Sequence, residues 1–258
     1  MRISIDVQMH YRFSRPNTVF LALETARTDG QQVLDSTMQL GDARVDRIIG
    51  DDAIGERIWA RVPGLEMRLT YRAMLDISRP VTSLDGLRAM PLHMIPGAVA
   101  PYLRPSRYCQ SDKFMAFVEK RFGHLVGGQK VAAMRDWVEA EMSYVPGSSH
   151  ADTDVLDTFA ARQGVCRDYV HLFCALVRAA QIPARAVAAY GADVWPQDFH
   201  AVAEVWLDNG WHLVDPTGMC AQDAIAVVGV GRDAYDIAFM DSEAPAEMLF
   251  QQVQVSRV

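Results

Sequence analysis

The sequence has no long apolar run. No stretch reaches the roughly 18 apolar residues that a membrane-spanning helix needs. The first residues, MRISIDVQMHYRF, alternate polar and apolar side chains and lack the apolar core of a signal peptide. We therefore expect no membrane association and a cytoplasmic location.

Cysteine and positive charge are both scarce. The 258 residues include 4 cysteines, which form neither a CxxC pair nor a zinc-binding spacing. Free thiols are expected in a reducing compartment, and neither a metal nor a cofactor is predicted. The 25 basic and 32 acidic residues give a net charge of −7, which argues against a general nucleic-acid-binding protein. The cysteines are Cys109, Cys166, Cys174 and Cys220.

The first 95 residues have the pattern of strands. Polar and apolar residues alternate from Arg2 to Phe13, which is typical of a strand with one buried face. Turn residues separate further apolar stretches, which predict strands at residues 18–25, 43–49, 57–62 and 65–77. Residues 1–95 are therefore interpreted as a β-sandwich domain.

A proline-rich connector follows, and the periodicity changes after it. Apolar residues at helical spacing predict helices over residues 111–125 and 129–144, a short segment over 155–162, and a helix that starts near Cys166. Strand patterns return at residues 184–189, 199–207 and 211–214. We therefore expect an α+β fold with a second domain at residues 96–258.

Cys166 is placed directly before an amphipathic run, in GVCRDYVHLFCALV. A helix N-terminus favours a thiolate and offers free backbone N–H groups that can stabilise an oxyanion. Gly164 would permit a tight approach into the helix, and Asp168 is expected to cap N–H groups of its first turn. The alternative is that Cys166 is a small apolar residue packed in the core, which is the usual state of a free cysteine.

A catalytic thiol would need a histidine as its proton shuttle. His171 lies about 140° around the predicted helix from Cys166 and therefore cannot face the thiol. His200 begins a predicted strand, and Asp215 ends the next one. Because a carboxylate at that position needs a partner, His200 is a good candidate.

The register of the predicted hairpin tests this pairing. A two-residue Asn209-Gly210 loop would leave His200 about 13 Å along the strand from Asp215, which is too far. A wider loop over residues 207–210 pairs Trp206 with Trp211 and makes His200 a diagonal neighbour of Asp215. We predict the second register.

These blocks together resemble the bacterial transglutaminase-like superfamily. They are Gly-Val-Cys166-Arg-Asp-Tyr-Val-His-Leu, Ile182-Pro-Ala-Arg-Ala-Val, Asp-Phe-His200-Ala and Gly210-Trp-His-Leu-Val-Asp215-Pro-Thr. The β-rich first part is similar to the N-terminal region of these bacterial proteins. One departure is Val202, where the family usually has tryptophan.

The resemblance implies a papain-like catalytic core with a Cys–His–Asp triad. Cys166 would be the nucleophile, His200 the general base and acid, and Asp215 the orienting carboxylate. The implied substrate is an amide of a peptide or protein, and the favoured reaction is hydrolysis, as in a cysteine protease or amidase. Alternatives are a cross-linking or deamidating transglutaminase, a non-catalytic binding protein, and a metal site at the same three residues. The sequence does not predict an oligomeric state.

Overall fold

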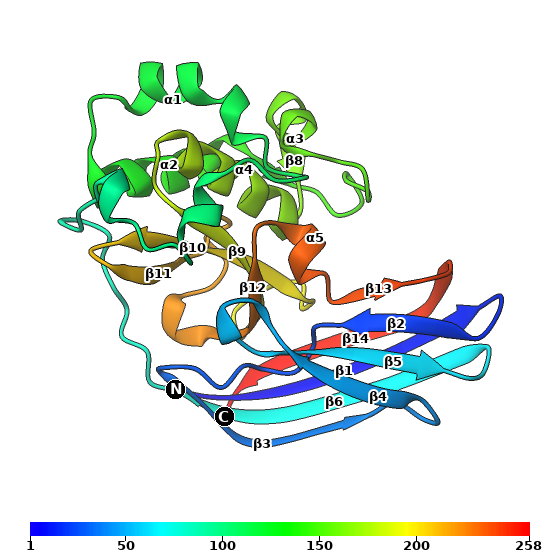
Figure 1. The fold of residues 1–258 in the computed structure, drawn as a ribbon. Helices are drawn as coiled ribbons and strands as arrows, with labels where there is room; N and C mark the ends of the chain where they lie inside the picture. Colours follow the sequence, from blue (N-terminus) through cyan, green and yellow to red (C-terminus); the bar gives the residue numbers. More distant parts are fainter.

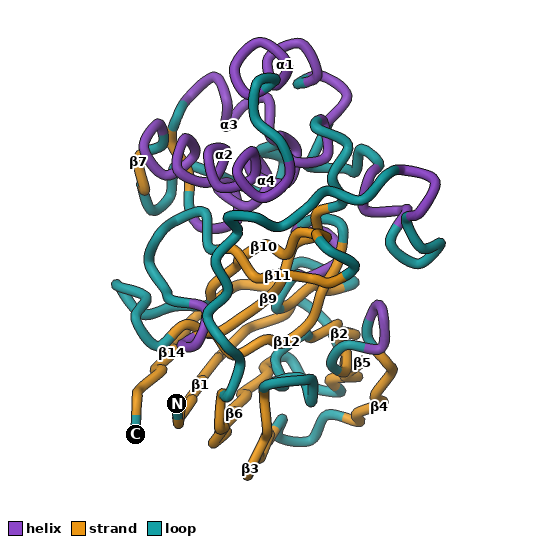
Figure 2. Tube along the Cα trace, turned by 90° about the vertical axis from the view of Figure 1, so that its left-hand side faces the viewer, coloured by secondary structure: helices purple, strands orange, loops and turns teal.

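The computed structural model describes all 258 residues. Its main parts are a set of helices, a central four-stranded sheet and two further four-stranded sheets (Figure 1). The helices cover one side of the central sheet, and the N-terminal sheets lie on its other side, as the rotated view also shows (Figure 2). This arrangement confirms the predicted α+β fold. None of the helices has both the length and the apolar character to cross a membrane.

The N-terminal part consists of two four-stranded antiparallel sheets. The predicted alternation in β1 is confirmed, because Ile3, Ile5 and Val7 are buried while their neighbours are partly exposed. The first sheet has the order β14 (Ala246–Arg257), β1 (Arg2–Phe13), β6 (Glu66–Ile77) and β3 (Gln31–Gln39). The second has the order β13 (Met240–Ser242), β2 (Asn17–Leu21), β5 (Glu56–Val62) and β4 (Arg44–Ile49).

The chain returns to these sheets at its end. The sequence analysis placed residues 240–257 with the second domain, but β13 pairs with β2 and β14 pairs with β1 along nearly its whole length. Val253 and Val255 of β14 are buried in the same core as the apolar face of β1. The two termini therefore lie close together (Figure 1), and the proposed division near residue 95 stays a prediction.

The central sheet is antiparallel and carries the second half of the chain. Its order is β11 (Gly210–Val214), β10 (His200–Leu207), β9 (Ala184–Gly191) and β12 (Ile225–Gly231). Around it lie α1 (Met115–Phe122), α2 (Gly127–Glu141), α3 (Val155–Ala161), α4 (Cys166–Ala179) and α5 (Ala234–Ile237). Short 3₁₀ turns occur at Asp51–Ala53, Leu92–Met94, Ala100–Leu103, Ser111–Lys113 and Gln222–Ala224.

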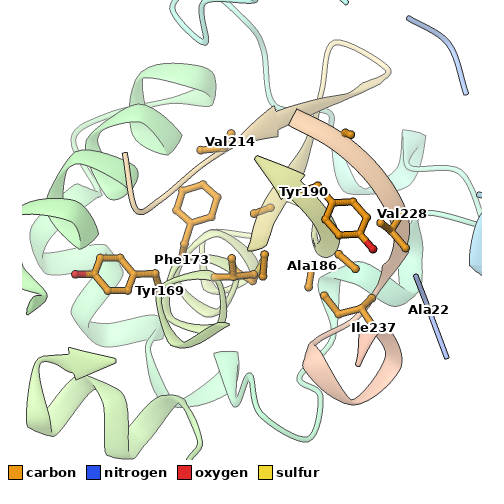
Figure 3. Close-up of a cluster of buried hydrophobic side chains, with 14 of the residues drawn as sticks. Ala22, Tyr169, Phe173, Ala186, Tyr190, Val214, Val228 and Ile237 are labelled. Carbon is orange, nitrogen blue, oxygen red and sulfur yellow. The ribbon is translucent and has the colours of Figure 1, made fainter. Parts of the chain in front are cut away.

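Helix α4 is the centre of this half, because every residue from 168 to 178 is buried. Its apolar side chains, such as Phe173, pack with Ala186 and Tyr190 of β9 in one continuous core (Figure 3). The polar residues within it have partners: the Arg178 Nε donates to the carbonyl of Ala184 at 2.9 Å. A helix buried on all sides has little freedom to shift, so its first residue is held firmly in place.

Several elements differ from the sequence-based prediction. The helix predicted over 129–144 ends at Glu141, and β7 (Ser143–Tyr144) follows it. This short strand pairs in parallel with β8 (Gln163–Gly164), immediately before α4. Strands β3 and β12 were not predicted, since β3 has little alternation and β12 is buried throughout.

Candidate active site

Cys166 is the first residue of α4 and the only one of the four cysteines that is not fully buried. Burial raises the pKa of the other three thiols, to about 11 for Cys174 and for Cys220, and well above the ordinary value for Cys109. Cys166 is therefore the thiol best placed to react.

The start of α4 depends on the residues on either side of Cys166. The carboxylate of Asp168 accepts a hydrogen bond from the backbone N–H of Val165 at 2.8 Å, so Asp168 reaches back over the first turn. A Cβ added to Gly164 would lie 2.5 Å from the Cβ of Asp168, which only glycine avoids. The close approach at Gly164 is as expected, but Asp168 caps the N–H of Val165, just before the helix, and not N–H groups of the first turn. The two contacts hold Cys166 at the helix N-terminus.

His200 and Asp215 come from neighbouring strands of the central sheet. His200 begins β10, and Asp215 follows the last residue of β11. The predicted register is confirmed, because Trp206 pairs with Trp211. The strands are joined by Asp208 and Asn209, both at positive φ, as a tight type I′ turn requires, and not by the wider loop that was expected.

Asp215 is held by four hydrogen bonds. Its Oδ2 accepts from the His200 ring at 2.9 Å and from the backbone N–H of Cys220 at 3.0 Å. Its Oδ1 accepts from the backbone N–H and the hydroxyl of Thr217, at 2.9 and 2.7 Å. Burial alone would raise the pKa of Asp215, but the hydrogen bond and charge of His200 lower it below its ordinary value. The carboxylate is therefore fixed in both position and charge.

The imidazole of His200 is oriented by this carboxylate. Because an ionised carboxylate only accepts hydrogen bonds, the Nε2 atom of His200 is the donor to Asp215. The other ring nitrogen, Nδ1, is buried and has no conventional hydrogen-bond partner. Burial favours a neutral ring, but the hydrogen bond with Asp215 and the proximity of Cys166 outweigh it and raise the pKa of His200 to about 10. His200 is thus held by Asp215 and lies near Cys166.

Tyr144 also lies beside Cys166, and the sequence analysis missed it. It was assigned to the end of a helix, whereas it belongs to β7 and pairs with Gly164, two residues before Cys166. Burial and the charge of Cys166 raise the pKa of its phenol. The only signal in the sequence is that Tyr144 directly precedes the turn Val-Pro-Gly, which could have indicated the end of a strand.

The remaining candidates have other roles. His171 faces away from Cys166, as expected: its ring stacks on Tyr108, and its Nε2 accepts from the backbone N–H of Ala234. Burial lowers the pKa of His171 to about 3. Val202 is fully buried in a small apolar cluster with Val187. No group of three or more histidine, cysteine, aspartate and glutamate side chains has an arrangement suited to a metal ion.

Known proteins share this arrangement of the chain. A model of the transglutaminase-like superfamily matches residues 116–216. A crystal structure of a "putative cysteine protease" from Cytophaga hutchinsonii superposes with a TM-score of 0.91 at 28% identity, over 99% of this chain and 90% of that one. This likeness spans the N-terminal sheets as well as the central sheet.

Two relatives are similar in sequence. An uncharacterized protein of Mycobacterium leprae is 32% identical over 148 residues, which are 53% of this chain and 52% of that protein. A protein-glutamine gamma-glutamyltransferase of Pseudomonas aeruginosa is 30% identical over 217 residues, which are 79% of this chain and 29% of that protein. The chain thus spans about half or less of the length of these relatives.

The matched range of the family model contains the whole of α4, the strands β9 to β11, and the residues Cys166, His200 and Asp215. The superposition on the Cytophaga hutchinsonii structure, the match to the family model and the chain order Cys166, His200, Asp215 all indicate the same family. This chain carries a transglutaminase-like superfamily domain.

Proposed function

We propose that the protein is a thiol-dependent acyl-transfer enzyme that hydrolyses amide bonds of peptides or proteins. One observation carries this proposal. The His200 ring is fixed by Asp215 through Nε2, and its buried Nδ1 is left for Cys166, the one partly exposed thiol, at a helix N-terminus. Thiol, proton shuttle and orienting carboxylate are the three parts that nucleophilic catalysis by cysteine requires.

In the first half of the proposed reaction, the Sγ of Cys166 attacks the carbonyl carbon of the amide. A C–S bond forms, and the π electron pair of the carbonyl moves to its oxygen. When the tetrahedral intermediate collapses, the C–N bond breaks and the nitrogen takes the proton from Nδ1 of His200. The products of this half are a free amine and a thioester on Cys166.

In the second half, water attacks the thioester. Nδ1 of His200 takes a proton from the water as the C–O bond forms, and collapse of the second intermediate breaks the C–S bond. The carboxylic acid leaves, and the thiolate of Cys166 and the imidazolium of His200 are regenerated. Asp215 stabilises the imidazolium and keeps its ring in place through both halves.

A second candidate is transfer of the acyl group to an amine, and it shares the first half with hydrolysis. It is favoured by the similarity to the P. aeruginosa protein-glutamine gamma-glutamyltransferase, which extends over 79% of this chain. The two reactions differ only in whether water or a primary amine attacks the thioester. Partitioning of the thioester between the two therefore distinguishes them.

The test is a screen of a peptide and protein amide library with wild-type protein and Cys166→Ala. Chain cleavage, ammonia release and incorporation of a labelled primary amine are scored separately. Cys174→Ala, which removes a buried thiol from the same helix, is the matched control. We expect activity in the wild type and the control, and none in Cys166→Ala. Activity that survives in Cys166→Ala contradicts the proposal, and a wild type inactive on every substrate favours a binding protein.

A further inference from the structure

Strand β14 presents a free edge. It is the outermost strand of the first N-terminal sheet and pairs with no strand other than β1 (Figure 2). The backbone N–H of Val258 donates to the carbonyl of Arg2, and in an antiparallel pair the residues that bond to the partner strand alternate with residues that do not. The backbone groups of Gln251 and Val253 therefore point away from β1, in the plane of the sheet.

The side chain of Gln197 already binds this edge as the backbone of another strand would. Its amide donates from Nε2 to the carbonyl of Val255 at 2.5 Å and accepts at Oε1 from the N–H of Val255 at 2.9 Å. Val253 is two residues away from Val255, so it presents the same pair of groups in the same direction. The edge can thus hold an amide group by both its donor and its acceptor.

The middle of β14 lacks most of the features that protect an edge strand from pairing with another chain. Residues 248–256 include no charged residue and no proline. The side chains of Met248, Leu249 and Phe250 are exposed. Trp195, in the loop between β9 and β10 that approaches this edge, is 80% exposed. Exposed tryptophan and contiguous exposed apolar side chains are typical of surfaces that bind other chains.

A hollow of about 360 Å³ lies between this loop and β14. It is lined by Trp195, Gln197, Asp198 and residues 251–254. Asp198 is the only charged residue in its wall, is exposed, and takes part in no ion pair. Its Oδ1 accepts from the backbone N–H of Phe199 at 2.8 Å and from the side-chain amide of Gln251 at 2.9 Å. The carboxylate is therefore held in place while its charge stays uncompensated.

Asp198 also connects the hollow with the proposed reaction centre. It lies two residues before His200. Its negative charge contributes to the raised pKa of Tyr144, which lies beside Cys166. The hollow is thus next to the residues that would carry out acyl transfer, and a chain bound in it passes close to the thiol.

We propose that the free edge of β14 binds the substrate, an extended polypeptide that adds to the sheet as a further strand and places a lysine or arginine side chain against Asp198. This inference rests on the proposed acyl-transfer function and specifies its substrate class. The outward backbone groups of Gln251 and Val253 supply hydrogen bonds that do not depend on the sequence of the peptide. Asp198 supplies the selectivity, because a cation gains a charge-assisted hydrogen bond there, whereas a carboxylate is repelled.

The first test measures selectivity. Peptides from the library screen carry lysine, norleucine or glutamate at one position, which is scanned on both sides of the reacting amide. They are compared as substrates of wild type and Asp198→Asn, and Asp193→Asn, in the same loop and paired with Arg257, is the control. We expect wild type and control to prefer lysine, and Asp198→Asn to lose about 3- to 10-fold in kcat/KM on the lysine peptide alone. No loss, or an equal loss on all three peptides, overturns the inference.

The second test isolates the edge. Gln251→Pro removes an outward N–H, which a strand tolerates when that N–H faces away from the sheet, and Gln251→Ala removes the same side chain but keeps the N–H. Both are made in Cys166→Ala, so that no turnover occurs, and thermal unfolding shows that each is folded. Fluorescence anisotropy then gives the Kd of a labelled lysine peptide. We expect a Kd about 5-fold higher for Gln251→Pro than for Gln251→Ala. Equal values of Kd overturn the inference.

A free edge could also pair with a second copy of this chain. Sedimentation velocity tests this: a wild-type dimer that Gln251→Pro abolishes overturns the inference, whereas a monomer supports it. The binding measurement also separates the two proposals. Lysine-selective binding that depends on Asp198, with no turnover of any peptide, rejects acyl transfer and supports the β14 edge as a peptide-binding site. Turnover of peptides without lysine selectivity rejects the edge and leaves acyl transfer standing.

Discussion

The ring of His200 and the carboxylate of Asp215 are joined by a hydrogen bond of 2.9 Å from Nε2 to Oδ2, in a place where both side chains are buried. The two residues are 15 positions apart in the sequence and come from adjacent antiparallel strands. This contact leaves only Nδ1 of His200 available to Cys166. The proton-transfer steps proposed here therefore all pass through one nitrogen atom.

Removing the charge of Asp215 is expected to slow acyl transfer. In Asp215→Asn the His200 imidazolium loses the carboxylate that stabilises it, so the pKa of His200 should fall from about 10 toward its ordinary value. We expect turnover to drop by about 10²- to 10⁴-fold. The alkaline limit of activity should also move to lower pH, because the leaving amine needs the His200 proton. A pH–rate profile measures both effects, and Asp193→Asn, which removes an exposed carboxylate paired with Arg257, is the control.

The stability of the protein should depend on the protonation of His200. The pKa of His200 is higher in the folded protein than its ordinary 6.5, so its contribution to the free energy of unfolding is complete below about pH 6.5. That contribution is lost as the pH rises through about 10. Thermal unfolding of wild type and His200→Gln, measured from about pH 6 to pH 10, should give a difference in Tm that shrinks with rising pH. A difference that grows with pH would contradict this.

Gly164 is expected to be required for the helix start. A methyl group there would meet the Cβ of Asp168 at 2.5 Å, in a turn whose geometry Asp168 itself defines. Gly164→Ala should lower the free energy of unfolding by about 1–3 kcal/mol and reduce alkylation of Cys166. Gly97→Ala is the control, because nothing lies within 4 Å of its added Cβ. Chemical denaturation of both variants measures the effect. If Gly164→Ala is as stable as Gly97→Ala, an added methyl group at residue 164 is tolerated and the prediction is wrong.

Arg185 should stabilise the contact between the N-terminal sheets and the central sheet. Its buried guanidinium lies 2.6 Å from Glu204 of β10 and 2.5 Å from Asp52 of the N-terminal part. Arg185→Ala leaves both carboxylates without their partner, so we expect a loss of about 3 kcal/mol in the free energy of unfolding. Arg2→Ala breaks an exposed pair with Asp76 and should lower the free energy of unfolding far less. Similar losses from both variants would mean that the buried ion pairs of Arg185 stabilise the folded protein no more than the exposed Arg2–Asp76 pair does.

Much of this structure could be predicted because it depends on local patterns. The alternation in β1, the amphipathic start of α4 and the hairpin register follow from residues close together in the chain. The register was decided by the requirement that His200 reach Asp215. The type of turn could not be decided in this way, because a two-residue turn at Asp208 and Asn209 gives the same strand pairing as the wider loop.

The missed features depend on contacts between distant segments. Tyr144 continues an apolar helical pattern, and only its pairing with Gly164 makes it a strand residue next to Cys166. Likewise, β14 follows the second half in the sequence but completes a sheet with β1. The partner of Arg185 at Asp52 lies 133 residues away. Local periodicity carries no information about such pairings.

The most direct test of the central claim is the rate of Cys166 alkylation by iodoacetamide at about pH 6, where a free thiol is almost entirely protonated. Labelling is followed by mass spectrometry of the intact protein and of its peptides, in wild type and in His200→Ala. The account predicts that Cys166 reacts faster than free cysteine, that the three buried cysteines stay unlabelled, and that the advantage disappears in His200→Ala. Labelling of Cys166 no faster than free cysteine, or equally fast without His200, would contradict it.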